Sequence, residues 1–145
     1  MKLRSIELAL PDPAAAATFM TRIWGMAEAE TKGDTHYLRG SGPFPYLVAF
    51  EKAQDEFVRS TTFVCTSEEL EALKARVTAA GWTASPTTSD DLGGGHGLLV
   101  ELPEGTILRF LVGAAEVAPI AGRDLPVKLT HVVFNAADAE ACGHA

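Results

Sequence analysis

Residue types that commonly carry out chemistry are few in this 145-residue chain and stand far apart. The histidines and cysteines are His36, His96, His131, His144, Cys65 and Cys142. Two scattered cysteines predict neither a disulfide framework nor a zinc cluster. We expect both to be thiols in a reducing cytoplasm, where disulfides are rare. The spacing of these residues does not by itself predict a catalytic centre.

His96 lies in the glycine-rich stretch Gly93–Gly97, directly after Asp90 and Asp91. We expect a flexible loop with a solvated histidine, because no partner that would make His96 a general base is visible nearby. The stretch also lacks the spacing and the preceding strand of a phosphate-binding loop. His36 is expected on the face of a strand.

Arg109 is a charged residue within an apolar run, between Leu108 and Phe110. Alternation along a strand places Arg109 on the inner face of the sheet, and Ser5 and Glu7 share the corresponding face of the first strand. We expect Arg109 to pair with Glu7 or with another acid there, because an unpaired buried charge is strongly destabilising. Two alternatives are that Arg109 binds an anionic ligand or that it snorkels to the solvent at the rim.

The elements that would position these residues occur twice in the same order. The first set is a strand over 3–10, a helix over 14–24 and strands over 27–31, 35–39 and 46–51. The second set is a strand over 58–65, a helix that begins with the capping box of Thr66 and Glu69, and strands over 82–85, 97–102 and 106–112. The repeat predicts an α+β fold, with two tandem βαβββ units in an antiparallel sheet and the helices outside it.

Apolar stripes on the two helices identify the faces expected to be buried. On the first helix the stripe is Ala16, Phe19, Met20, Ile23 and Trp24, and on the second it is Leu70, Leu73 and Val77. We expect Phe19, Trp24 and Trp82 in the core, because large aromatic residues are usually buried.

One complete domain over 3–113 follows from this pattern, with units 3–52 and 57–113. Residues 114–126 are rich in alanine, proline and glycine and are predicted to be a linker. Residues 127–145 are predicted to start a second domain, with a strand over 127–135 and the beginning of a helix. A lone strand and half a helix cannot bury a face, so we expect this chain to be cut from a longer one.

The composition excludes some partners. The net charge is −7, which argues against nucleic acid, since a phosphate backbone attracts a basic surface. No apolar run approaches the length needed to cross a membrane, and the first residues lack the features of a secretion signal. We therefore expect a cytoplasmic protein that contacts no membrane.

Two stretches resemble the vicinal oxygen chelate superfamily, which contains glyoxalases, bleomycin-resistance proteins and type I extradiol dioxygenases. The first runs from Leu10-Pro11-Asp12-Pro13 to Trp24-Gly25-Met26, and the second from Gly95 to Phe110, with the turn Pro103-Glu104-Gly105 before the last strand. The resemblance implies that the paired units curl their sheet into a cup. It covers essentially all of 3–113 and resumes at 127.

In this family the metal ligands come from the first and last strands of each unit, and the matching positions here are Ser5, Ala49, Ser60 and Arg109. Two hydroxyls, a methyl and a cation do not suit a divalent metal, which prefers histidine and carboxylate. The resemblance therefore implies a cup without a metal or other cofactor of its own. The residues expected to line it are Ser5, Glu7, Ala49, Ser60, Thr62 and Arg109.

His131 stands where Ser5 and Ser60 stand in their units. This pattern resembles two-domain extradiol dioxygenases, in which the first domain is metal-free and the second carries the iron. The resemblance implies that His131 is the first ligand of Fe(II), or of another divalent metal, in an intact parent that cleaves a catechol-like substrate. This chain alone would then be inactive.

Other interpretations remain open. A metal-free small-molecule binder, similar to bleomycin-resistance proteins and often dimeric, would need no residue beyond 113. A glyoxalase-like or epimerase-like metalloenzyme is disfavoured by the residues at the four ligand positions. We also expect a homo-oligomer, because an unpaired strand edge can pair with a neighbouring chain.

Overall fold

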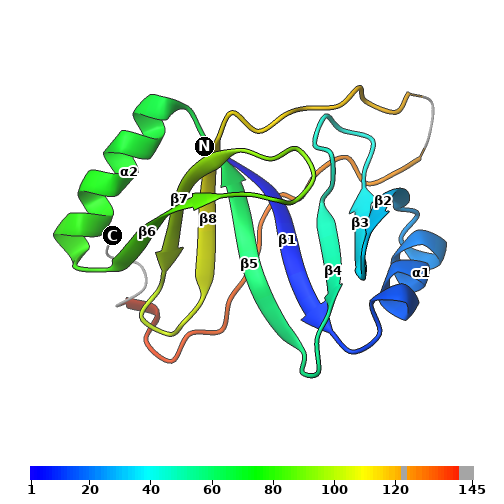
Figure 1. Cartoon of the computed structure of the whole chain (residues 1–145), viewed down its shortest axis with the longest axis horizontal. Helices are drawn as coiled ribbons and strands as arrows, with labels where there is room; N and C mark the ends of the chain where they lie inside the picture. The colour runs from blue at the N-terminus through cyan, green and yellow to red at the C-terminus, as the bar shows by residue number, and fades with distance from the viewer. Residues whose placement is uncertain (122–123, 141–145) are drawn as a thin grey trace.

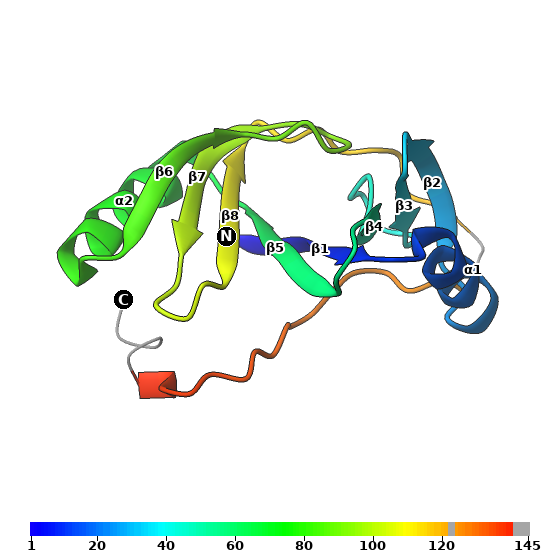
Figure 2. The same cartoon turned by 60° about the horizontal axis from the view of Figure 1, so that its bottom comes forward.

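The computed structural model describes residues 1–121 and 124–140. The chain forms one eight-stranded mixed sheet. Figures 1 and 2 show that the sheet is strongly bent and open, with one helix near each end. The predicted α+β class and the two βαβββ units are confirmed, but the sheet is mixed rather than antiparallel, because the first and last strands of each unit pair in parallel.

The first unit consists of β1 (Lys2–Leu10), α1 (Pro13–Ile23), β2 (Ala27–Lys32), β3 (Thr35–Arg39) and β4 (Val48–Lys52). The second consists of β5 (Phe57–Val64), α2 (Ser67–Ala80), β6 (Thr83–Thr88), β7 (His96–Glu101) and β8 (Ile107–Val112). In each unit the first strand pairs in parallel with the last, β1 with β4 and β5 with β8. The two first strands, β1 and β5, pair antiparallel and join the units at the middle of the sheet. The strand order is β2-β3-β4-β1-β5-β8-β7-β6.

Local sequence signals fix both helices. Asp12 caps α1 by accepting a hydrogen bond from the Ala15 amide at 3.0 Å, and Pro13 occupies the first turn, where its missing N–H costs nothing. Thr66 and Glu69 form the predicted capping box of α2. Gly81 ends α2 with a φ of 70°, a left-handed conformation that glycine adopts readily.

The apolar stripe predicted for α1 is wrong in part. Ala17 is buried, and Ala16 and Met20 pack against the core of the first unit. Phe19, Ile23 and Trp24, however, are 55%, 68% and 62% exposed. The side of α1 that carries Ala16, Ala17 and Met20 faces the sheet, so Phe19, Ile23 and Trp24 lie away from it. Leu70, Leu73 and Val77 are buried as predicted, and Trp82 packs against the edge of their cluster.

The C-terminal segment differs from its prediction. No residue in 127–135 is part of a strand. The alternating pattern favours an extended conformation, but no neighbouring strand pairs with this segment. The predicted final helix begins at residue 139 and lies largely outside the described residues. The proposed linker is held against the first unit, since Ser41 exchanges backbone hydrogen bonds with Ile120 and Pro126.

Two glycines make this contact possible. A β-carbon at Gly40 would lie 2.0 Å from the Pro126 carbonyl oxygen, and one at Gly42 would lie 2.5 Å from that of Val127. We call residues 114–121 and 124–130 the strap. Figure 1 shows it leaving β8 and returning behind the sheet of the first unit.

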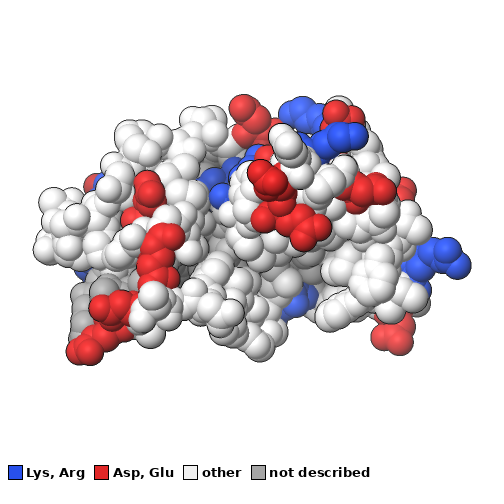
Figure 3. Space-filling model, turned by 90° about the horizontal axis from the view of Figure 1, so that it is seen from below, with Lys and Arg blue, Asp and Glu red and all other residues white. Residues whose placement is uncertain are grey.

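Charge on the surface follows the composition. On the face shown in Figure 3, acidic side chains cover more of the described surface than basic ones, and some of the basic side chains lie together near the upper edge beside acidic ones. Within the same residues, no helix is both long and apolar enough to cross a membrane.

Candidate functional site

The inner face of the sheet, the cup, carries two rows of side chains that cross neighbouring strands. Ala49, Glu7 and Ser60 are direct neighbours across β4, β1 and β5. Ser5, Thr62 and Arg109 form the next row across β1, β5 and β8. Because neighbouring strands lie only about 4.8 Å apart, these side chains meet at the middle of the sheet.

Glu7 is the centre of this arrangement and is 1% exposed. Its Oε1 accepts hydrogen bonds from Ser5 at 2.6 Å and from Tyr46 at 2.9 Å. Its Oε2 accepts hydrogen bonds from Ser60 at 2.8 Å and from Thr62 at 2.9 Å. Four hydroxyl groups therefore compensate the carboxylate for its lost hydration, as a buried charge requires.

Arg109 completes the surroundings of Glu7. Its Nη2 lies 3.2 Å from Glu7 Oε2, at ion-pair distance but without hydrogen-bond geometry. Its Nε donates to Thr62 at 3.0 Å, and its Nη1 lies 2.8 Å from Asp91 Oδ2. The expected pairing of Arg109 with an acid in the cup is present, with two acids rather than one.

Asp91 extends the network outward. It accepts a hydrogen bond from the Tyr37 hydroxyl at 2.8 Å and from Arg59 Nη2 at 2.9 Å. Arg59 Nη1 in turn lies 3.0 Å from Glu51 Oε2 near the rim. Charges of opposite sign thus alternate from the rim to Glu7. We call this set the buried polar network: Arg4, Ser5, Glu7, Tyr37, Tyr46, Glu51, Arg59, Ser60, Thr62, Ser89, Asp91 and Arg109.

Two β-bulges turn arginine side chains toward the cup, although strict alternation along the strand would place them on the outer face. Between Leu3 and Ser5, β1 contains one more residue than β5, and this extra residue is Arg4. At the other end of the same ladder the extra residue is Arg59, on β5. A bulge turns a side chain away from the face that alternation assigns to it. Sequence reasoning therefore missed both arginines.

The loop 89–95, which was predicted only as a flexible connection, closes the cup. Its Ser89 and Asp91 are buried, and Leu92 packs against Tyr37, Tyr46 and Ala49. Figure 1 shows this loop, between β6 and β7, crossing β5 and β1 toward β4. The second unit thus covers the inner face of the first.

Electrostatics keep the network in one protonation state. Burial raises the pKa of the Tyr46 hydroxyl, and the negative charge of Glu7 raises it further. Burial and the hydrogen bond to Asp91 raise the pKa of Tyr37. Burial alone would raise the pKa of Asp91, but Arg59, Tyr37 and Arg109 together lower it below its ordinary value. Both tyrosines remain donors and Asp91 remains an acceptor at neutral pH.

A divalent metal does not fit the donor set of this cup. Ser5 and Ser60 direct their hydroxyl groups at Glu7 as donors, Ala49 offers a methyl group and Arg109 a cation. Glu7 already accepts four hydrogen bonds. No group of three histidine, cysteine or acidic side chains in 1–121 and 124–140 has a geometry that could hold a metal.

The histidines lie outside the cup. His131 is exposed on the segment without a strand, 3.0 Å from the hydroxyl of Thr130, so the strand register inferred for it is not formed. His96 is exposed at the start of β7, and His36 lies half-buried on β3 beside Thr31. His144 lies outside the described residues.

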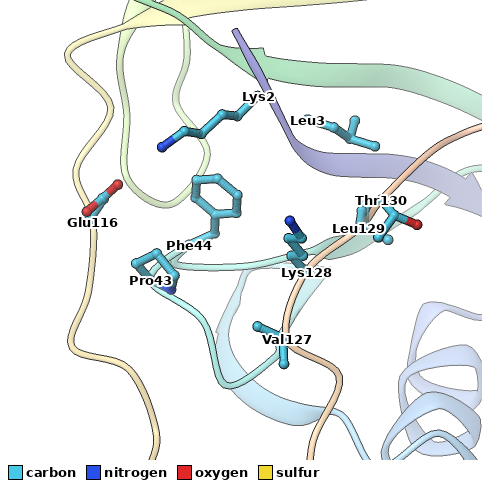
Figure 4. A pocket seen from close by; sticks show the side chains of 9 residues that line it. All are labelled: Lys2, Leu3, Pro43, Phe44, Glu116, Val127, Lys128, Leu129 and Thr130. Carbon is cyan, nitrogen blue, oxygen red and sulfur yellow. The ribbon is translucent and has the colours of Figure 1, made fainter.

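A separate hollow of about 380 Å³ lies between the start of β1, the loop before β4 and the strap. Figure 4 shows Lys2, Phe44 and Lys128 around it. Its remaining lining is Leu3, Pro43, Glu116, Val127, Leu129 and Thr130. The hollow therefore combines apolar walls with two amines and one carboxylate.

No family model matches the sequence, and no curated protein matches it. Solved structures do match. The Mn(II)-bound glyoxalase from Novosphingobium aromaticivorans superposes with a TM-score of 0.80 at 22% identity, over 90% of this chain and 46% of that one. Homoprotocatechuate 2,3-dioxygenase from Brevibacterium fuscum, in complex with 3,4-dihydroxyphenylacetate, superposes with a TM-score of 0.80 at 20% identity, over 90% of this chain and 44% of that one.

An extradiol ring-cleaving dioxygenase from B. fuscum also matches, with a TM-score of 0.72 at 20% identity, over 81% of this chain and 34% of that one. This chain therefore spans less than half the length of each of these structures. At such identities the likeness concerns the fold. The chain has the vicinal-oxygen-chelate fold of glyoxalases and extradiol dioxygenases, as the resemblance in its sequence predicted.

Proposed function

We propose that this chain is a metal-free N-terminal domain of a glyoxalase- or extradiol-dioxygenase-like protein, in which it serves as a scaffold. The observation that supports this most directly is the environment of Glu7. In a metal-dependent cup a carboxylate would face the ion, whereas here four hydroxyls and Arg109 surround it. Moving a metal into this place would first require breaking these contacts.

In this proposal the intact parent is a non-haem, metal-dependent dioxygenase that cleaves a catechol-like ring. Fe(II), or another divalent metal, would hold the substrate oxygens in a second domain. His131 would be one of its ligands there. Its exposure and its position outside the buried polar network leave the imidazole accessible to such a role. The two domains could also support oligomer formation through exposed strand edges.

Metal binding by the chain tests the scaffold role. The purified chain is incubated without oxygen with Fe(II) or Mn(II), desalted, and analysed for metal by mass spectrometry. We expect far less than one metal per chain, and no oxygen consumption with 3,4-dihydroxyphenylacetate. One metal per chain, retained after desalting and lost in Glu7→Gln but kept in His131→Ala, would overturn the proposal.

The parent activity needs its own test. The full-length product of the gene, loaded with Fe(II), is expected to consume oxygen when 3,4-dihydroxyphenylacetate or a related catechol is added. His131→Ala should abolish this consumption and His96→Ala should not. Equal activity in both variants would contradict the assignment of His131, and a full-length protein that is inactive on every catechol would contradict ring cleavage.

A metal-free small-molecule binder is the second candidate, and the hollow in Figure 4 favours it. Its volume of about 380 Å³ lies in the range of ligand pockets. The probe is the anionic dye anilinonaphthalene sulfonate, which this function predicts to bind once per chain, with binding lost in Leu129→Lys. The control is Val133→Lys, since Val133 is 80% exposed. Equal dye binding by both variants would exclude this hollow as the site.

A further inference from the structure

Arg4 is a positively charged residue that is completely buried. Its exposure is 0%, the same as that of the neighbouring Ser5. The bulge in β1 places both side chains on the inner side of the sheet. Its guanidinium lies over the ring of Tyr46, 4.9 Å from the ring centroid. Burial of a cation at this depth is strongly unfavourable unless an anion compensates it.

The partners of Arg4 differ from those of the other two arginines in the network. Arg59 and Arg109 each pair with two carboxylates. Arg4 donates only to hydroxyl groups, from Nε to Ser5 at 3.2 Å and from Nη2 to Tyr46 at 2.7 Å. In the described part of the chain, no carboxylate lies within ion-pair distance of Arg4. Its Nη1 is buried and has no hydrogen-bond partner.

A small hollow of about 90 Å³ has Arg4 in its lining. Its lining is Arg4, Phe44, Val64, Cys65, Leu111, Gly113, Ala114, Ala115 and Glu116. A water molecule occupies about 30 Å³ in the liquid, so the space suits a group of one to a few atoms. Phe44, Val64 and Leu111 contribute apolar atoms to the wall, and Arg4 is the one cationic side chain among the lining residues.

We propose that this hollow binds a small monovalent anion, such as chloride or bromide, which accepts a hydrogen bond from Arg4 Nη1. A monovalent ion is favoured over sulfate, because the single cation in the lining would leave one charge of a doubly charged ion uncompensated. The site is separate from the Glu7 carboxylate, which lies beyond Ser5 and Tyr46. Anion binding would complete the compensation of the buried cation and fix the start of the strap against β1.

Thermal unfolding of the chain in different sodium salts at equal ionic strength tests this proposal. Chloride and bromide are compared with gluconate, which is too large for the hollow. We expect the Tm to rise by about 4 °C at an anion concentration about ten times the Kd, and then to increase slowly with concentration. Arg4→Met should remove the difference between the salts.

Because Arg4→Met could fail to fold, a second variant leaves Arg4 in place. Ala114→Leu fills the hollow, and it should unfold at the same temperature in chloride and gluconate. Glu56→Gln is the matched control, because it removes one negative charge at an exposed residue outside the lining of the hollow, and its chloride response should equal that of the unmodified chain. Equal Tm values for the unmodified chain in all three salts would overturn the proposal.

Crystals soaked in sodium bromide locate the ion directly. An anomalous peak at hydrogen-bond distance from Arg4 Nη1 is the expected result. A hollow that contains only water, or the carboxylate of Glu116, would overturn the proposal.

Discussion

On strand β1 the polar side chains of Ser5 and Glu7 are more deeply buried than the apolar side chains of Ile6, Leu8 and Leu10. Ser5 and Glu7, on the inner face, are 0% and 1% exposed. Ile6, Leu8 and Leu10, on the outer face, are only partly buried against α1. The inner face is closed twice, by the bend of the sheet and by the loop 89–95, whereas the outer face is covered by one helix in each unit and, in the first unit, also by Leu129 of the strap. Depth of burial in this fold therefore follows closure of the cup rather than hydrophobicity.

The two faces of the sheet contribute to stability in different ways. Apolar contacts stabilise the outer face, and substitutions at its exposed positions should change the stability little. On the inner face, polar side chains form hydrogen bonds and ion pairs with one another. Removing one partner from such a network strongly destabilises the protein. Substitutions on the two faces should accordingly differ in their cost.

Glu7→Gln should have the largest effect. It removes the negative charge that Arg109 and four hydroxyl donors surround, and leaves buried cations without this compensation. We expect a loss of about 3–5 kcal/mol in the free energy of unfolding, measured by urea denaturation at pH 7. Glu51→Gln is the control near the rim, and it should lose less than about 1 kcal/mol. Similar losses for both would show that depth in the cup does not matter.

Asp91→Asn should come next, with a loss of about 3 kcal/mol at pH 7, because it leaves Arg109 and Arg59 each with one carboxylate fewer. The size of this loss should depend on pH. The folded-state pKa of Asp91 is lowered, so its ionised form stabilises the protein above the ordinary aspartate pKa of about 3.9. This stabilisation is lost as the pH falls through the lowered folded-state value.

The difference between the unmodified chain and Asp91→Asn should thus be constant from about pH 5 to pH 7 and shrink below about pH 4. Asp90→Asn is the neighbouring control, because the Asp90 side chain is exposed and its backbone oxygen makes the contact to Lys32. A difference that grows on acidification would contradict the network.

Trp24→Ala should have the smallest effect, within about 0.5 kcal/mol, because this side chain is largely exposed on the outer face. Met26→Ala, two residues away and 6% exposed in the core of the first unit, should cost about 2–4 kcal/mol. Calorimetric unfolding of the two variants compares them. A large loss for Trp24→Ala would mean that the outer face is covered in solution.

The sequence predicted the repeat and the inner row well, because both depend on periodicity. Alternation placed Ser5 and Glu7 on one face, and the family resemblance matched Ser5 with Ser60 on the first strands and Ala49 with Arg109 on the last strands. These residues meet because β1 and β5 are neighbours at the centre of the sheet.

The same alternation could not find Arg4 or Arg59, since a bulge shifts the register without a signature in the residue pattern. Asp91 was missed because its position depends on a loop that reaches the other unit, a long-range contact. The strand predicted over 127–135 failed for a related reason, because a strand needs a partner as well as a pattern. The burial of Phe19 and Trp24 was wrong because helix periodicity does not say how closely a helix lies to its sheet.

A double-mutant cycle between Glu7 and Arg109 tests the central claim that protein groups occupy the place of a metal in this cup. The free energies of unfolding of Glu7→Gln, Arg109→Met and the double variant are measured at pH 7 without added metal. We predict a coupling energy of at least about 2 kcal/mol, as for close buried charges. A coupling below about 0.5 kcal/mol, or a chain that needs an added divalent metal to reach its full stability, would contradict the account.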